Sequence, residues 1–147
     1  GLKYAPHLLR ATQARFDAPP VLESWPAPGP AMVQNPANLQ AVTQAMVQVL
    51  HGPTGTARGV MAQFHLGYTV AGKTGTAQRV SRRGEQSRDV NQLPFTQRHN
   101  ALFIAFAPTD APRVAVMVVV EHGGSGSAVA TPVALRIIDA WLRRNPE

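Results

Sequence analysis

The residues best suited to chemistry in this sequence lie in one short stretch, Ala71 to Gln78, which reads Ala-Gly-Lys-Thr-Gly-Thr-Ala-Gln. Lys73 is one of only two lysines in the chain, and its ammonium is a compact charge with three hydrogen-bond donors. Thr74 and Thr76 add hydroxyl donors, and the neighbouring glycines let a ligand approach the backbone closely. These residue types at this spacing predict a site that grips an anionic group.

The same residues allow a second interpretation, because residues 67–74 fit the phosphate-loop pattern G-x-x-x-x-G-K-[ST]. The apolar run 116–120 followed by Glu121 also resembles the strand and acid that hold magnesium in such proteins. A phosphate loop, however, opens directly into a helix whose N-terminus faces the phosphates. Here Gly75 follows the pattern at once, and no helical periodicity appears before residue 101. The context therefore disfavours a P-loop-type nucleotide-binding protein, which stays the alternative.

Composition indicates a globular chain. Of its 147 residues, 44% are hydrophobic and 15% are charged, which fits one domain with a sizeable core. No run approaches the roughly 18 apolar residues that a transmembrane helix needs. The chain starts at Gly1 without a methionine, so we expect an excised or processed piece of a longer protein, with any membrane anchor outside it.

The net charge of +6 does not indicate nucleic-acid binding. The arginines of the segment 79–98 are diluted by Glu85 and Asp89, and aromatic residues do not interleave with them as a stacking platform requires. The absence of cysteine excludes disulfides and thiol catalysis. We expect no metal site either, because no ligand spacing such as i, i+4 on a helix links His51, His65, His99 and His122.

Two helices and an antiparallel sheet are predicted around the motif. Apolar residues recur at helical spacing over 36–50, with Asn35 as the N-cap and Gly52-Pro53 as the stop. A strand is expected over 68–78, followed by a polar, mobile loop over 79–98. A second amphipathic helix is expected over about 128–144.

Two apolar runs, 101–107 and 113–120, predict strands covered on both faces, because neither run alternates with polar residues. Their five-residue connector is too short for a helical crossover, so they should pair antiparallel. Shorter strands are expected within 4–12 and 21–25. The predicted fold class is α+β, an antiparallel sheet flanked by helices on both faces and present here in part.

The Lys-Thr-Gly triplet and its surroundings resemble the penicillin-binding transpeptidases, a family of serine enzymes. The order and spacing of several features match, namely residues 52–57, the motif strand, the run 103–108, the strand 114–121 and the Gly-Gly loop before the last helix. The short loop Glu121 to Gly126 is most similar to the elongation-type penicillin-binding protein 2. The resemblance runs from about Lys3 to Leu142, and implies a partial penicillin-binding (β-lactamase-like) fold.

The sequence departs from the family pattern in one respect. Its serines stand only at positions 24, 81, 87, 125 and 127, and none is followed by a lysine three residues later or by x-Asn. The family's nucleophile, its lysine base and its middle motif are therefore not in this sequence. We interpret residues 1–147 as the C-terminal portion of a D,D-transpeptidase domain that is inactive alone. A purely binding, non-catalytic fragment is the other possibility.

The resemblance implies roles for four residues. Lys73 would bring positive charge and support proton transfer, and Thr74 and Thr76 would hold the terminal carboxylate of D-Ala or of a β-lactam. The backbone N–H of Thr76 would donate to the oxyanion, and Gly75 would let substrate lie along the strand. Lys73 and Thr76 are thus the candidate catalytic residues, and Lys73, Thr74, Gly75 and Thr76 the candidate substrate-binding residues.

Partners and location follow from the same resemblance. It implies peptidoglycan stem peptides ending in D-Ala-D-Ala and β-lactam antibiotics as ligands, without a metal or organic cofactor. It also implies contact with the upstream half of the same domain and with the cell-elongation glycosyltransferase machinery that maintains cell shape. The expected location is the periplasmic face of the bacterial inner membrane.

Overall fold

A computed structural model of the protein describes residues 1–78 and 93–146. The chain forms two compact units that divide after Gln40, inside the helix α1 (Pro36–His51). The polar loop predicted over 79–98 falls mostly outside the described residues, and its described end contains the 3₁₀ turn η2 (Phe95–Gln97).

The first unit contains a two-stranded antiparallel ribbon, β1 (Ala11–Thr12) and β2 (Val21–Leu22). Both strands are shorter than the 4–12 and 21–25 predicted from sequence. Prolines at positions 6, 19, 20 and 26 explain this, because each lacks the N–H that a longer ladder would need.

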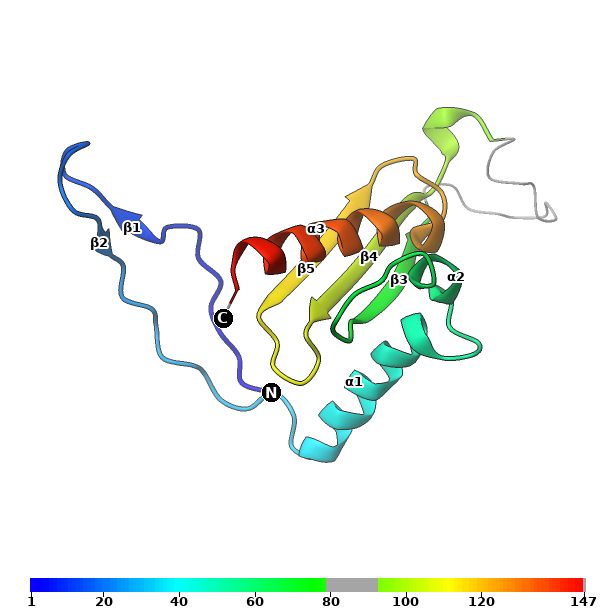
Figure 1. Ribbon diagram of the computed structural model, residues 1–147, viewed down its shortest axis with the longest axis horizontal. Helices are drawn as coiled ribbons and strands as arrows, with labels where there is room; N and C mark the ends of the chain where they lie inside the picture. The colour runs from blue at the N-terminus through cyan, green and yellow to red at the C-terminus, as the bar shows by residue number, and fades with distance from the viewer. Residues whose placement is uncertain (79–92, 147) are drawn as a thin grey trace. The chain divides into compact units, whose positions relative to one another are not determined.

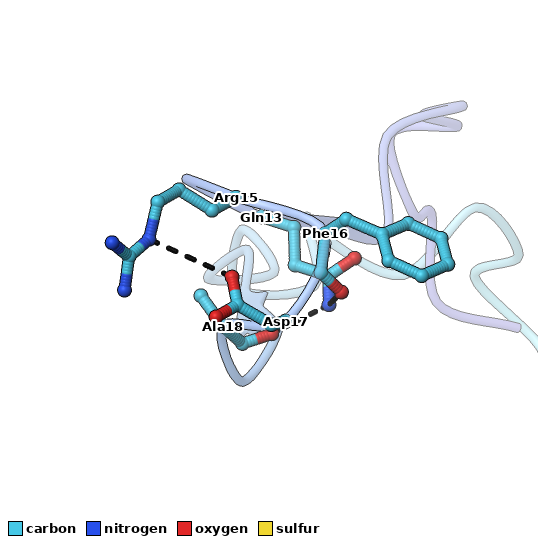
Figure 2. A network of polar contacts seen from close by, with 5 residues as sticks. All are labelled: Gln13, Arg15, Phe16, Asp17 and Ala18. Atoms are coloured by element: carbon cyan, nitrogen blue, oxygen red, sulfur yellow. Dashed lines mark hydrogen bonds and ion pairs between the residues drawn. The ribbon is translucent and has the colours of Figure 1, made fainter.

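Side-chain contacts organise the turn that joins β1 to β2 (Figure 2). The amide nitrogen of Gln13 donates to the carbonyl oxygens of Phe16 at 3.4 Å and Ala18 at 2.5 Å. Arg15 and Asp17 form an ion pair with 3.6 Å between Nε and Oδ1, and both side chains are exposed. Exposed pairs of this kind contribute little to stability, so the turn is held mainly by the Gln13 bonds together with the backbone bond from Ala18 N–H to the Arg15 carbonyl oxygen, 3.0 Å long.

The helix predicted over 36–50 is confirmed as α1, and its N-terminus is capped as expected. Asn35 Oδ1 accepts a hydrogen bond of 3.0 Å from the backbone N–H of Ala37. The helix ends at His51, directly before Gly52 and Pro53. A second, very short helix, α2 (Arg58–Met61), follows, and the sequence did not predict it.

A three-stranded antiparallel sheet forms the centre of the second unit (Figure 1). Its order is β3 (Ala71–Ala77), β4 (Asn100–Ala107), β5 (Val114–Val120). The predicted antiparallel pairing of the two apolar runs is confirmed, with Ile104 opposite Met117. The motif strand is also confirmed, although it begins at Ala71 and not at Tyr68. The α+β fold class holds.

One face of the sheet is buried under the C-terminal helix α3 (Thr131–Arg144), which Figure 1 shows lying across the strands. Phe103 of β4 and Leu135 and Ile138 of α3 have no exposed surface. The loop after β5 reaches α3 through a π-helix, η3 (Gly126–Ala130). The predicted helix over 128–144 is therefore real, but its first turn is the π-helix and the regular part starts at Thr131.

The other face of the sheet is apolar and open to solvent within the described residues. Ile104 is 45% exposed, Met117 63% and Val119 50%. The prediction of strands covered on both faces is therefore met on one face only. Both faces carry apolar side chains, which is why the sequence shows no alternation. Across residues 1–78 and 93–146, no helix is both long and apolar enough to cross a membrane.

Candidate functional site

The predicted site residues lie together on β3, at an edge of the sheet. In the described part of the chain β3 pairs only with β4, so its other edge is unpaired. An unpaired edge presents backbone N–H and C=O groups that can hydrogen-bond an extended ligand. The motif is therefore placed where a peptide could add as a further strand.

The lysine and the threonines point to different faces of this strand. Residues opposite each other in an antiparallel pair project to the same face. Thr74 lies opposite Phe103, whose side chain is buried, whereas Lys73 lies opposite Ile104 on the open face. Lys73 is exposed and Thr74 half-buried, in line with this register. The site thus surrounds the strand edge and does not lie on one face.

Lys73 folds back along its own strand. Its Nζ atom donates a hydrogen bond of 2.7 Å to the carbonyl oxygen of Thr74. This bond uses one of the three ammonium donors and fixes the charge beside the strand edge. The positive charge expected from the sequence is therefore held close to the motif's own backbone.

Thr74 has a partner that sequence reasoning did not assign. Its hydroxyl oxygen lies 3.0 Å from that of Thr56, in the loop between α1 and α2. The block 52–57 was noted only for its likeness to a family, and nothing local indicates that one of its hydroxyls meets the motif. A contact across 18 residues depends on how the loop packs, which no periodicity reveals.

The back of the motif strand is supported by the glycine-rich loop after β5. A Cβ atom on Gly126 would lie 2.3 Å from the carbonyl oxygen of Gly75 and 2.5 Å from that of Leu102. Only a glycine allows the π-helix to approach the two strands this closely. The short loop from Glu121 to Gly126 therefore packs against the motif, with His122 and Gly124 at positive φ.

A polar network fixes the entry to β3. The Tyr68 hydroxyl donates to Asp139 Oδ1 at 3.4 Å, and Arg143 Nε donates to Asp139 Oδ2 at 2.8 Å. Burial raises the pKa of the Tyr68 phenol to about 12, with a further contribution from the Asp139 carboxylate. The network ties the segment before the motif to α3. The strand predicted from Tyr68 joins the β3–β4 ladder only at Ala71.

The phosphate-loop interpretation fails on this geometry. Lys73 and Thr74 lie inside a strand that continues to Ala77, whereas a phosphate loop requires a helix to begin directly at these two residues. The segment 67–70 is not a buried strand leading into a nest of N–H groups. Glu121, which resembles the magnesium-binding acid of such proteins, follows β5, and β5 pairs antiparallel with its neighbour β4.

Comparison with known proteins identifies the family. The model of the penicillin-binding protein transpeptidase domain matches residues 1–139. The chain belongs to this family. Its similarity to the curated peptidoglycan D,D-transpeptidase MrdA of Salmonella typhimurium is 32% identity over 142 residues, covering 95% of the chain. The chain spans 22% of that relative's length, about a fifth.

Solved transpeptidases share the fold. Penicillin-binding protein 2 of Pseudomonas aeruginosa, in complex with WCK 5153, matches with 43% identity and a TM-score of 0.64 over 82% of this chain and 23% of its own. The ceftriaxone acyl-enzyme complex of penicillin-binding protein A from Mycobacterium tuberculosis matches with 28% identity and a TM-score of 0.60, over 85% and 25%. The predicted resemblance to elongation-type penicillin-binding protein 2 is confirmed.

Proposed function

We propose that this chain is the substrate-clamping side of a peptidoglycan D,D-transpeptidase that also binds β-lactams. One observation carries the proposal: Lys73, Thr74, Gly75 and Thr76 occupy an edge strand of the sheet, in a chain of the penicillin-binding transpeptidase family. A cation, two hydroxyls and an unpaired backbone edge are what an extended peptide ending in a carboxylate needs for recognition.

In the proposed reaction a serine oxygen attacks the carbonyl of the penultimate D-Ala of a stem peptide. The bond to the terminal D-Ala breaks, this residue leaves as the amine with a proton, and an acyl-serine remains. The amine of a neighbouring stem peptide then attacks the ester, which forms the cross-link and returns the proton to the serine. A β-lactam enters through the same first step, in which its ring amide opens.

Each motif residue has a part in this scheme. Thr74 and Thr76 donate to the carboxylate, and the ammonium of Lys73 supplies the positive charge that attracts it. The Thr76 N–H donates to the oxyanion that forms at the attacked carbonyl, a type of contact typically worth about 3 kcal/mol in the transition state. Gly75 has no side chain that would keep the peptide from lying beside the strand.

The serine and its lysine base would come from a segment outside these 147 residues. The same segment would cover the open apolar face of the sheet. The setting we propose is the periplasmic face of the inner membrane. There the enzyme would work with cell-elongation glycosyltransferase machinery.

Labelling with a fluorescent penicillin tests the proposal. The complete gene product, expressed with whatever sequence adjoins these residues, should become covalently labelled, and unlabelled penicillin should compete. The 147-residue chain alone should show no covalent label. A complete product that stays unlabelled contradicts the proposed function, and a labelled 147-residue chain contradicts the assignment of the nucleophile to another segment.

A further inference from the structure

The Thr56–Thr74 contact extends the site beyond the motif. We infer that Thr56 is a positioning residue for the carboxylate clamp: its hydroxyl donates to Thr74 Oγ1, so that the proton of Thr74 stays available for the substrate. The inference rests on the proposed function. The observation behind it is the 3.0 Å separation of the two hydroxyl oxygens, which come from the α1–α2 loop and from β3.

Hydroxyl chemistry decides the direction of this bond when an anion is bound. A threonine hydroxyl has one proton to donate and two lone pairs to accept with. If Thr74 donates to a carboxylate, it has no proton left for Thr56, so the bond between the two can run only from Thr56 to Thr74. A donor on its oxygen also polarises the Thr74 hydroxyl and strengthens the bond that it gives to the anion.

The loop holds Thr56 in place from both sides. A Cβ on Gly55 would meet the carbonyl oxygen of Gln48 at 2.4 Å, so the loop lies directly against the end of α1. On the other side, Ala57 is fully buried and its N–H donates to the carbonyl oxygen of Val49 at 2.9 Å. Thr56 itself is exposed, and these two contacts fix its backbone before a ligand arrives.

Lys73 is not the donor to the Thr74 hydroxyl. Its Nζ bonds to the carbonyl oxygen of Thr74 and its side chain starts from the opposite face of the strand. Within the described residues, Thr56 is the side chain that hydrogen-bonds the Thr74 hydroxyl. A single such bond changes binding by about threefold to tenfold when it is removed.

The test uses the complete gene product and the second-order rate of acylation by benzylpenicillin. Thr56→Val keeps the shape and removes the hydroxyl, and should slow acylation about threefold to tenfold. Thr56→Ser should restore the rate. Thr54→Val is the matched control, because Thr54 lies in the same exposed loop and makes no side-chain hydrogen bond within the described residues. It should acylate like the wild type.

Two further measurements distinguish a positioning role of Thr56 from a purely structural role in holding the loop against β3. Acylation by the methyl ester of the same penicillin, which has no carboxylate, should not respond to Thr56→Val. In the Thr74→Val background, adding Thr56→Val should cost less than about twofold, since the hydroxyl that it positions is gone. Equal losses with acid and ester, additive losses in the double variant, or a wild-type rate in Thr56→Val would each overturn the inference. An unlabelled wild-type product would instead contradict the proposed function.

Discussion

Lys73 and Thr74 are adjacent in the chain but project from opposite faces of β3, and Lys73 Nζ donates to the carbonyl oxygen of Thr74 at 2.7 Å. A ligand that meets both the ammonium and the Thr74 hydroxyl must therefore lie across the strand edge. A peptide added along that edge satisfies this requirement, and a ligand resting on either face does not. The arrangement favours recognition of an extended chain.

Magnesium nucleotides should not bind. The glycines and lysine of the pattern lie in and before a strand, so the nest of N–H groups that cradles phosphates is not formed. Isothermal titration of the chain with ATP or GTP and magnesium should give only heats of dilution. A micromolar dissociation constant would contradict the account of this strand.

Gly126→Ala should destabilise the protein by about 1–3 kcal/mol, because the new methyl group would overlap the backbone of Gly75 and Leu102. Urea denaturation of the complete gene product measures this. Gly59→Ala is the matched control, since a Cβ there meets no atom within 4 Å. Equal stability of both variants would show that η3 does not pack on β3 as described.

The 147-residue chain alone should associate or melt early through the open face of its sheet. At about 25 cal/mol per Å², leaving roughly 200 to 300 Å² of apolar surface uncovered costs about 5 to 8 kcal/mol. Such a cost is comparable to the whole stability of a domain, about 5–15 kcal/mol. Sedimentation and thermal melting check this. A monomer with a sharp transition above about 60 °C would show that the face needs no cover.

Met117→Lys tests the same face more specifically. Met117 is 63% exposed, so the charge should reduce association of the 147-residue chain. In the complete gene product it should be destabilising, because the cover would bury it. Val133→Lys on α3, 40% exposed, is the control and should change neither. A complete product that tolerates both variants equally would place the missing half elsewhere.

Stability should fall in alkali partly because of Tyr68. Its pKa is about 12 in the folded protein against 10.0 ordinarily, so between these values the folded state holds a proton that the unfolded state has lost. The contribution is complete below pH 10 and is lost as the pH rises toward 12. The melting temperature of Tyr68→Phe should therefore drop less between pH 9 and 11.5 than that of the wild type. Parallel curves would argue against the burial of the Tyr68 phenol beside Asp139.

Elements with strong local signals were predictable. Asn35, Gly52 and Pro53 mark the ends of α1 through capping chemistry that needs no tertiary contact. The short connector between β4 and β5, residues 108–113, permits only a tight antiparallel return. The motif strand also follows from local composition, although the ladder starts at Ala71 and Tyr68 instead hydrogen-bonds Asp139 on α3.

Features that depend on packing were not predictable. Thr56 reaches Thr74 only because the α1–α2 loop rests on the end of α1, and α2 is too short to show a helical period. The sequence also could not tell which face of the sheet this chain covers, because β4 and β5 carry apolar residues on both. Family resemblance, not pattern, supplied the roles proposed for the motif.

The most direct test of the central claim is the rate at which benzylpenicillin acylates the Lys73→Ala variant of the complete gene product. An exposed strand lysine contributes little to stability but much to anion capture, so the rate should fall at least about tenfold while the melting temperature stays near that of the wild type. Lys3→Ala should acylate normally. A wild-type rate in Lys73→Ala would remove Lys73 from the site and contradict the account.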